Sequence, residues 1–507
     1  MQSEIVKTPT LSKSSFASGL QCYKRLWIEK NDSGLVPEPP LSKQAIFDQG
    51  HEVGSWSHRL FKDGILLRNE LDFKAHLQAS RDALASRNPL FEPAFAIPGA
   101  YARADILVPV GAGQWDLLEV KSSSNVWDDN ARTRISAVYL QDIAFQLYVY
   151  RSAGIDVRQA YLVFLDRDYI RQGEIDPHRL FRREDVTNLA EALLPAIPSQ
   201  LATLSQVIQR STVPEMGIGL QCSSPYDCSL MSHCWKNVPV DSIFTLYGAG
   251  TDAWAWWNDG IIRVADLPPT GEYSSKQAIQ ITAERTQERY LDAPAVQRFL
   301  ESLRYPLNFL DFETIMPAVP MFDGCRPYAQ VPFQFSLHFQ RSPGGQVTHL
   351  AHLADGWGDP RLGFLQALQA SLHPDGSIVS YNSSFETSRL KELAKQLPDY
   401  AGWIESILPR FANADLLQPF RAFAIYDPSQ HGSASIKAVL PAFTDLRYED
   451  LAIQDGGTAS SQFLALLKGL IPKEEIAKLR ENLSKYCERD TLAMVKLVEK
   501  LQLMIAS

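Results

Sequence analysis

The chain has no excess of positive charge. Lysine and arginine total 49 against 58 aspartate and glutamate residues, which gives a formal net charge of −9 and a sequence pI of about 5.7. This balance excludes a protein that coats nucleic acid through bulk positive charge. It does not exclude an enzyme that acts on nucleic acid, because such enzymes need carboxylates to hold metal ions.

Long apolar segments are also missing. No apolar run reaches the roughly 18 residues that span a bilayer, and the polar stretch up to Ser18 has no apolar segment before a small-residue cleavage site. We therefore expect a cytoplasmic protein without a membrane partner. The hydrophobic content of 45% excludes a largely disordered chain, and 507 residues favour two or three domains.

Cysteine is scarce, and its spacing is informative. Three of the six cysteines form a C-x5-C-x5-C run, at Cys222, Cys228 and Cys234, and Cys22 stands alone near the N-terminus. In a reducing compartment such a run indicates a metal or iron–sulfur site rather than disulfides. Its spacing suits a cluster better than a zinc ribbon, with zinc or simple burial as alternatives. We interpret Cys325 and Cys487 as structural.

A first group of polar residues lies on a predicted hairpin between about 95 and 122. Asp105 is on its first strand, and Glu119 and Lys121 are two residues apart on the second, so their side chains share a face. Two carboxylates there could hold Mg²⁺ or Mn²⁺, and Lys121 could stabilise charge on a phosphodiester or orient water. The alternative is an exposed Glu/Lys strand pair.

The helix predicted near 134–153 extends this group. It carries Gln146 and Tyr150 at i, i+4 on one face. The order Asp, hairpin, Glu-x-Lys, helical Gln-x-x-x-Tyr resembles that of RecB-like PD-(D/E)xK nucleases. The resemblance implies a catalytic set, with Asp105 and Glu119 as metal ligands: Asp105, Glu119, Lys121, Gln146 and Tyr150.

Such nucleases also carry an upstream histidine ligand, commonly four residues after a glycine. Here Gly54 takes that place after Gly50, and we assign the ligand to the neighbouring His51, with a solvated helix histidine as the alternative. One cysteine before the nuclease motifs and three after them resemble the iron–sulfur branch of this family. That resemblance implies a [4Fe–4S] cluster on Cys22, Cys222, Cys228 and Cys234.

A second group of acids begins on the predicted strand at 306–314. Asp311 and Glu313 share one face of it, Glu386 lies at helical spacing in YNSSFETSRL, and Tyr486 and Asp490 are at i, i+4. Four such acids can gather two cations about 3.5–4 Å apart, one activating water and one stabilising the leaving oxygen. The alternative is that each acid is simply solvated.

These three motifs, in this order, resemble the DEDD exonucleases of the ribonuclease H-like fold. The tyrosine marks the DEDDy branch, and Glu386 stands where that family usually has aspartate. The resemblance implies that Asp311, Glu313, Glu386 and Asp490 bind Mg²⁺ or Mn²⁺ and that Tyr486 orients water. Asp415 and Lys437 fall where such folds carry a strand end and a substrate-facing segment.

Together these observations predict an α/β protein that resembles a bacterial fusion of two nucleases. A restriction-endonuclease-like core occupies 1–240 and a ribonuclease H-like core 306–507. A small, mainly helical linker domain at 241–305, helix-hairpin-helix-like around GIIRVADLPPT, joins them.

The expected activity is metal-dependent hydrolysis of phosphodiesters. We expect a 3′–5′ exonuclease on single-stranded DNA ends, with RNA left open, in repair, recombination or phage defence; a helicase or defence-system partner stays unidentified. In one alternative only the C-terminal domain cuts, and the N-terminal domain binds DNA ends or a partner. In another the chain is a non-catalytic scaffold whose cysteines sense redox state.

Overall fold

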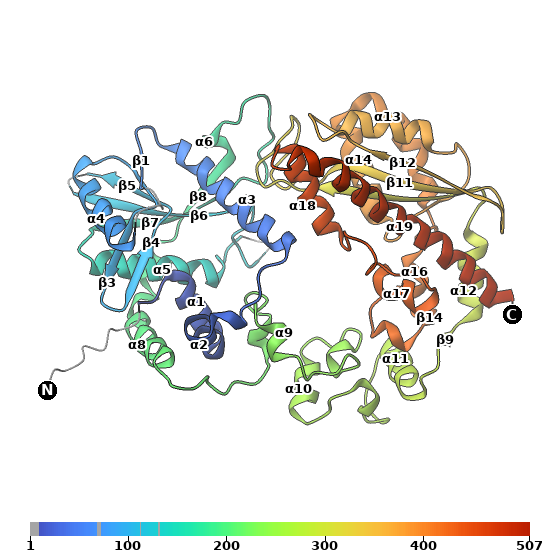
Figure 1. Cartoon of the computed structure of the whole chain (residues 1–507), viewed down its shortest axis with the longest axis horizontal. Helices are drawn as coiled ribbons and strands as arrows, with labels where there is room; N and C mark the ends of the chain where they lie inside the picture. Colours follow the sequence, from blue (N-terminus) through green and yellow to red (C-terminus); the bar gives the residue numbers. More distant parts are fainter. Residues whose placement is uncertain (1–9, 68–71, 112, 130–131, 507) are drawn as a thin grey trace. The chain divides into compact units, whose positions relative to one another are not determined.

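The computed structural model describes residues 10–67, 72–111, 113–129 and 132–506 (Figure 1). The chain forms two compact units of mixed α/β structure. The N-terminal unit contains the residues up to Lys236 together with Pro317–Tyr328, and the C-terminal unit contains Asn237–Met316 and the residues after Tyr328. In the described part of the chain, no helix combines the length and apolar character needed to cross a membrane.

The N-terminal unit is built on a six-stranded mixed sheet. Its order is β1-β2-β5-β6-β7-β8, with bounds Ile65–Leu66, Leu90–Phe91, Ile106–Val110, Gln114–Lys121, Val157–Leu165 and Phe181–Asp185. The hairpin expected from the sequence is confirmed, since β5 and β6 pair antiparallel with Ile106 opposite Leu118. Gly111 and Gly113 both have positive φ, 50° and 94°, which explains why the turn uses glycine.

Successive apolar side chains along β6 and β7 point alternately to the two faces of this sheet, and both faces are buried. Leu117 and Leu162 join a core with residues of α5 (Ala137–Ser152), whereas Leu118 and Val163 join a second core with Val53 of α3 (Leu41–Ser57). Because successive strand side chains point to opposite faces, α5 and α3 cover opposite faces of the sheet. Glu119 is two residues after Leu117 on β6, so its side chain points to the same face, toward α5.

Further helices and a hairpin complete the N-terminal unit. α1 and α2 are separated by Cys22 alone and pack with α8. Gly19 permits this packing, since a Cβ there would come within 2.6 Å of Leu204 and 2.8 Å of Leu26. The bounds are Lys13–Gln21 for α1, Tyr23–Asn31 for α2, Phe73–Ala83 for α4, Ala94–Ile97 and Ala100–Arg103 for β3 and β4, Pro177–Leu180 for α6, Thr187–Glu191 for α7, Ile197–Ile208 for α8 and Met231–Cys234 for α9.

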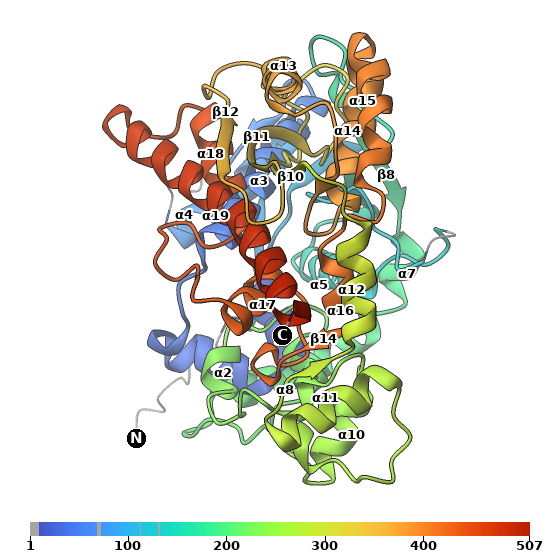
Figure 2. The same ribbon diagram turned by 90° about the vertical axis from the view of Figure 1, so that its right-hand side faces the viewer.

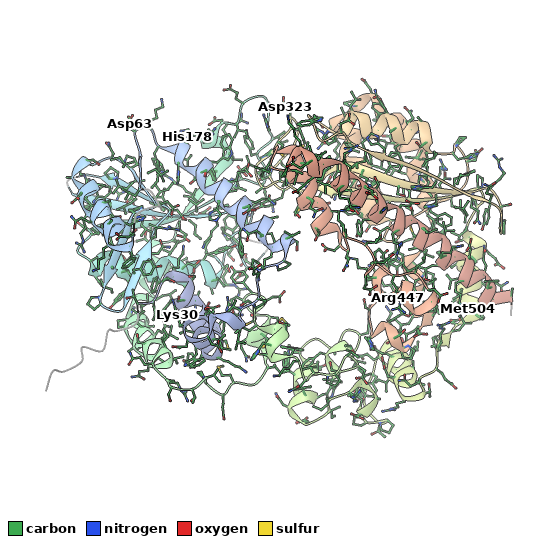
Figure 3. All side chains as sticks on the ribbon, viewed as in Figure 1. Lys30, Asp63, His178, Asp323, Arg447 and Met504 are labelled. Carbon is green, nitrogen blue, oxygen red and sulfur yellow. The ribbon has the colours of Figure 1, made fainter. Side chains whose placement is uncertain are left out.

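The segment Pro317–Tyr328 belongs to the N-terminal unit although it is distant in sequence. Ala318 and Val319 are buried in the core on the α3 side of the sheet. The backbone N–H of Ala318 donates to Gln49 Oε1 at 2.5 Å, and the Tyr328 hydroxyl donates to the carbonyl of Ser122, directly after β6. In the middle of the segment, Asp323, which is labelled in Figure 3, accepts a hydrogen bond from Gly173 N–H at 2.9 Å.

The first part of the C-terminal unit is mainly helical. α10 (Asp252–Asn258) and α11 (Ser275–Thr286) enclose a small core that includes Ile243, Val264 and Ile281 (Figure 2). The ADLP sequence lies at a short 3-10 helix, Val264–Asp266. α12 (Ala293–Ser302) then leads into the sheet.

The main sheet of the C-terminal unit has the order β12-β11-β10-β13. These strands are Val347–Leu353, Val331–Gln340, Leu307–Ile315 and Ile378–Val379. Leu310 and Phe335 point into a core formed with α13, α14 and α15. The alternating residues of these two strands, including Asp311, point to the opposite face of the sheet. On that face α19 packs on β10 and β11.

The other elements of this unit surround the sheet. The bounds are Arg361–Ser371 for α13, Ser384–Gln396 for α14, Ala401–Ile407 for α15, Leu417–Arg421 for α16, Ile436–Phe443 for α17, Gly456–Leu467 for α18 and Lys473–Ala506 for α19, with β9 (Tyr290–Leu291) pairing β14 (Ile425–Tyr426).

Candidate functional site

In the C-terminal unit, four acids predicted from the sequence lie in one region. Asp311 and Glu313 are on the α19 face of β10, Glu386 is in the first turn of α14, and Asp490 is on α19. Glu313, Glu386 and Asp490 are 7%, 1% and 8% exposed. Oxygens of Asp311 and Glu313 and the Cys487 sulfur all lie within 4.8 Å of one another.

Burial raises the pKa of all four acids, and the charges of neighbouring acids add to this effect at Asp311 and Glu313. Burial first, and then the charge of Asp490, raise the pKa of both Asp311 and Glu313 well above the usual range. Burial raises the pKa of Glu386 to about 8 and that of Asp490 to about 6. Buried carboxylates that repel one another become stable as anions when cations bind between them.

One carboxylate oxygen at this site has no partner. Among the described residues, Glu386 Oε2 is buried and makes no hydrogen bond. A buried oxygen of this kind costs free energy unless something binds it. Hard divalent cations such as Mg²⁺ and Mn²⁺ prefer oxygen ligands of this type. The four acids therefore fit the metal ions that the sequence implies.

Other side chains at this site were not part of the predicted metal-binding set. The Tyr448 hydroxyl donates to Asp490 Oδ1 at 2.5 Å, and the charge of Lys437 on α17 lowers the pKa of Glu313 and Asp490 against the effect of burial. Cys487 is buried, with its sulfur 3.7 Å from Asp311 Oδ2. A Cβ at Gly456 would lie 3.6 Å from Glu313 Oε2 and 3.9 Å from the Tyr486 hydroxyl, so glycine keeps space beside both groups.

In the N-terminal unit, the structure brings Glu119, Lys121 and Gln146 together. Lys121 Nζ donates to Glu119 Oε1 at 2.9 Å, and Gln146 Nε2 donates to Glu119 Oε2 at 2.6 Å. Asp105, which was expected on the first strand of the hairpin, lies directly before β5 and accepts from the backbone N–H of Val120 at 2.6 Å. The shared strand face and the i, i+4 helix pair inferred from the sequence account for this convergence.

Two residues at this first site were missed by sequence reasoning. Lys13, at the start of α1, contacts Glu119 Oε1, and Asp142 on α5 accepts from Lys121 Nζ at 2.5 Å. Ser12 caps α1 by accepting from Ser15 N–H at 3.1 Å, which fixes the first turn that carries Lys13. Asp142 could have been found as the residue one helical turn before Gln146.

Charge is more evenly balanced here than in the C-terminal unit. Burial, followed by the charge of Glu119, raises the pKa of Asp105 to about 7. Burial would also raise the pKa of Glu119, but Lys121 and Lys13 together lower it below the usual range. The protein's own ammonium groups therefore hold Glu119 as an anion.

The remaining residues predicted for this site lie around it. The Tyr150 hydroxyl donates to the carbonyl of Pro93 and accepts from Ala104 N–H at 2.9 Å, so it orders the backbone next to Asp105. His51, on α3, lines a pocket that Asp105 and Lys13 also line. Within the described chain, His51 does not join Asp105 and Glu119 in a group of ligand atoms lying within 4.8 Å of one another.

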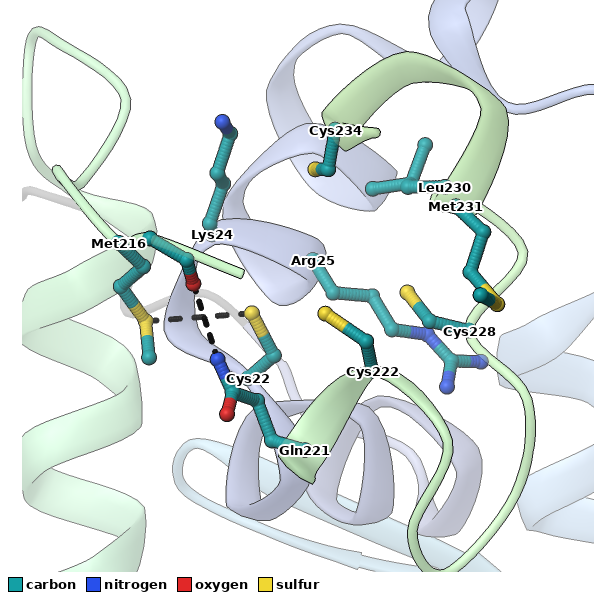
Figure 4. A pocket seen from close by; sticks show the side chains of 11 residues that line it. Cys22, Lys24, Arg25, Met216, Gln221, Cys222, Cys228, Leu230, Met231 and Cys234 are labelled. Atoms are coloured by element: carbon teal, nitrogen blue, oxygen red, sulfur yellow. Dashed lines mark hydrogen bonds between the residues drawn. The ribbon is translucent and has the colours of Figure 1, made fainter. Parts of the chain in front are cut away.

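The four cysteines predicted to act together line a single pocket. Figure 4 shows the thiols of Cys22, Cys222, Cys228 and Cys234 around a common space, and none forms a disulfide. Gln21 Nε2 donates to the carbonyls of Gln221 and Tyr226 at 2.8 and 2.7 Å, which joins the first and last parts of this unit beside the pocket.

The spacing of these sulfurs favours a cluster over a single ion. All four cysteines are among the described residues, yet no three of their sulfurs lie within 4.8 Å of one another. Four thiolates on one Zn²⁺, with Zn–S bonds of about 2.3 Å, must approach more closely than this. Thiolates that each bind a separate iron stand farther apart, so the residues fit the [4Fe–4S] group that the sequence implies.

Comparisons with known proteins identify relatives by sequence alone. Residues 308–435, which include Asp311, Glu313 and Glu386, match a domain of unknown function, DUF2779. The chain is similar to the uncharacterized protein MG366 homolog of Mycoplasma pneumoniae, with 29% identity over 38% of this chain and 32% of the relative. It is also similar to the uncharacterized protein MG366 of Mycoplasma genitalium, with 25% identity over 38% of this chain and 31% of the relative.

The chain therefore spans about a third of the length of these relatives. Among solved structures, a crystal structure of SSO0001 aligns with 47% of this chain and 91% of its own length, at 16% identity and a TM-score of 0.23.

Proposed function

We propose that the protein is a metal-dependent nuclease whose C-terminal unit is a 3′–5′ exonuclease on single-stranded DNA ends. The observation that carries this proposal is the group of four acids, Asp311, Glu313, Glu386 and Asp490. Three of the four are almost fully buried, their pKa values are raised, and Glu386 has an unpartnered oxygen among the described residues. A purely structural role would not explain why a fold buries so much like charge.

The four acids would hold Mg²⁺ or Mn²⁺. When bound, such ions activate water and stabilise the leaving oxygen of a phosphodiester. The protein's own part is positioning. Tyr448 holds the Asp490 carboxylate in one orientation by its 2.5 Å hydrogen bond. The Tyr486 hydroxyl, one helical turn before Asp490 on α19, would orient the attacking water.

We further propose a second nuclease centre in the N-terminal unit, at Asp105, Glu119 and Lys121. The contacts of Lys121 and Gln146 with Glu119 support it. One observation favours the alternative that this unit only binds DNA ends or a partner: Lys13 and Lys121 both contact the same oxygen of Glu119. That oxygen is already paired with two cations of the protein.

The proposal is tested with end-labelled single- and double-stranded DNA and RNA in Mn²⁺ or Mg²⁺. We expect Asp311→Asn to reduce degradation of single-stranded DNA at least about 100-fold, because loss of a metal ligand removes several kcal/mol of transition-state stabilisation. Glu499→Gln, an exchange on the outer side of α19 where Glu499 pairs with Lys496, is the matched control. Full activity in Asp311→Asn would contradict the proposal.

The same assay separates the two views of the N-terminal unit. A cleavage activity that persists in Asp311→Asn and disappears in Lys121→Ala assigns a second nuclease centre. If Lys121→Ala leaves every cleavage activity intact, the N-terminal unit is a binding module.

A further inference from the structure

A second cluster of metal-binding side chains lies in the C-terminal unit, apart from the four acids. It consists of His338 on β11, His349 on β12 and Glu488 on α19. One ligand atom from each lies within 4.8 Å of the other two, and His349 Nδ1 is 3.7 Å from the Glu488 carboxylate. Three separate elements thus contribute one ligand each.

Sheet register brings the two histidines together. β11 and β12 pair antiparallel with His338 directly opposite His349, and their rings stack with centroids 4.5 Å apart. His338 is two residues after Ser336 on β11, so both side chains point to the same face of the sheet. Ser336 pairs with Asp311 on β10. The cluster therefore lies on the face that α19 covers. Glu488 and Thr491, at i, i+3 on α19, both meet this face.

Hydroxyl groups engage one nitrogen of each imidazole. His338 Nδ1 lies 2.8 Å from Thr491 Oγ1, and His349 Nε2 lies 2.9 Å from Ser336 Oγ. The two hydroxyls are 2.6 Å apart, and Thr491 also donates to the carbonyl of Glu488 at 3.2 Å.

The hydrogen-bond network leaves two imidazole lone pairs for a ligand. A metal ion on the two histidines would select one proton arrangement, in which Thr491 donates to the Glu488 carbonyl and accepts from His338 Nδ1–H and from Ser336, and Ser336 accepts from His349 Nε2–H. Every donor is then satisfied. In this arrangement His338 Nε2 and His349 Nδ1 carry no proton, and His349 Nδ1 lies 3.7 Å from the Glu488 carboxylate. Metal-binding histidines have this arrangement, in which the outer ring N–H is fixed by a neighbouring acceptor.

The three side chains differ in exposure, as expected for a site that is open to solvent on one side. His338 is 4% exposed, whereas the side chains of His349 and Glu488 are 28% and 47% exposed. Solvent can reach the side that the three ligands leave open.

We propose that His338 Nε2, His349 Nδ1 and the Glu488 carboxylate bind one Zn²⁺ ion, with water completing the coordination. Two imidazoles and one carboxylate favour a borderline transition metal over Mg²⁺, which prefers oxygen ligands. The ion cross-links β11 and β12 to α19, the helix that carries Tyr486 and Asp490. It is therefore a positioning site, distinct in ligand chemistry from the four acids.

The test measures zinc bound per chain after dialysis of the full-length protein against Zn²⁺ with excess Mg²⁺. We expect His349→Gln and Glu488→Gln each to lose one equivalent, together with the zinc-dependent rise in melting temperature of the C-terminal unit. Both side chains are partly exposed, so these variants should fold, which circular dichroism verifies.

Two exchanges outside the cluster are the controls. His178→Gln changes an exposed histidine of the N-terminal unit (Figure 3), and Glu481→Gln changes an acid on α19 that pairs with Lys478 and Lys485. Both should retain the full zinc content. Equal zinc content and affinity in the wild type, His349→Gln and Glu488→Gln would overturn the proposal, whatever the nuclease assays give, because the readout is binding and not cleavage.

Discussion

At the scale of single residues, the hydrogen bond from Tyr448 to Asp490 is the contact that most directly controls one of the four acids. Burial raises the pKa of Asp490 to about 6, and the Tyr448 hydroxyl limits that rise. Without the hydroxyl, a larger fraction of Asp490 would be protonated near neutral pH, and a protonated carboxyl is a poor metal ligand.

We therefore predict that Tyr448→Phe needs about 10-fold more Mn²⁺ for half-maximal nuclease activity at pH 7, as expected when a hydrogen bond to a charged group worth about 1.5–3 kcal/mol is lost. The deficit should shrink at pH 8.5, where Asp490 is ionised in both proteins. Mn²⁺ titrations at the two pH values measure this. Tyr273→Phe, which removes a hydrogen bond to the Pro268 carbonyl instead, should behave like the wild type, and an unchanged Mn²⁺ dependence in Tyr448→Phe would refute the assigned role.

The sequence contains good signals for residues that share a strand face or a helix face. Glu119 with Lys121, Gln146 with Tyr150, and Tyr486 with Asp490 each follow a fixed spacing, and the structure places each pair on one element. Lys13 and Tyr448 follow no such spacing. They reach Glu119 and Asp490 from segments 106 and 42 residues away, and only the tertiary fold brings them there.

At the scale of secondary-structure elements, α11 carries an acid in an unfavourable environment. Burial raises the pKa of Glu284 to about 7, although Tyr426 donates a hydrogen bond to it at 3.3 Å. Between the unfolded pKa of about 4.3 and the folded value, the folded state binds more protons than the unfolded state. Stability therefore falls as pH rises through this window.

We expect Glu284→Gln to remove this loss. The variant should match the wild type near pH 4 and exceed it above pH 7 by about 1 kcal/mol, or about 2–4 °C in melting temperature for a unit of this size. Thermal unfolding at a series of pH values measures the difference. Glu288→Gln, at an exposed position just after α11, should change little, and a pH-independent effect of Glu284→Gln would contradict the explanation.

Elements with strong periodicity were predicted better than short ones. The β5–β6 hairpin, α5 and β10 all appear where the pattern of the sequence places them. β13 is limited to Ile378–Val379, because Ser380 forms only an isolated bridge with Asp415 and Asn382 adopts a positive φ of 77°. Two-residue strands such as β1 and β2 are too short for a period of two to be detected.

At the scale of the whole molecule, the cysteine pocket connects the beginning and end of the first 236 residues. Cys22 and Cys222 are 200 residues apart, and closing so long a loop stabilises a fold by on the order of 5 kcal/mol in chain-entropy terms. A cluster on these thiols would therefore stabilise the N-terminal unit without affecting the core of the C-terminal unit.

We predict that anaerobically purified protein contains iron and acid-labile sulfide, and that Cys228→Ser loses both. In calorimetry, the variant should show a lower melting temperature for the N-terminal unit and an unchanged transition for the C-terminal unit. Cys325→Ser, at a buried cysteine outside the pocket, should keep its iron. Zinc in place of iron would disprove the assignment of the cluster.

The segment Pro317–Tyr328 supports a prediction about fragments. Ala318 and Val319 fill part of the core on the α3 side of the sheet, and a fragment ending at Lys236 lacks them. We expect this fragment to bind a hydrophobic dye and to melt at a lower temperature than the same fragment fused through a flexible linker to residues 317–328. Identical melting curves for the two fragments would show that the segment adds nothing to the unit.

This discontinuity also affects how the protein is made. A ribosome finishes residue 236 well before it reaches residue 328, and at about 5–20 residues per second the interval of about 90 residues lasts roughly 5–20 seconds. During that time the nascent N-terminal unit has all four cysteines but an unfilled core. A cluster on these cysteines would therefore have a window for insertion during translation that a contiguous domain would not provide.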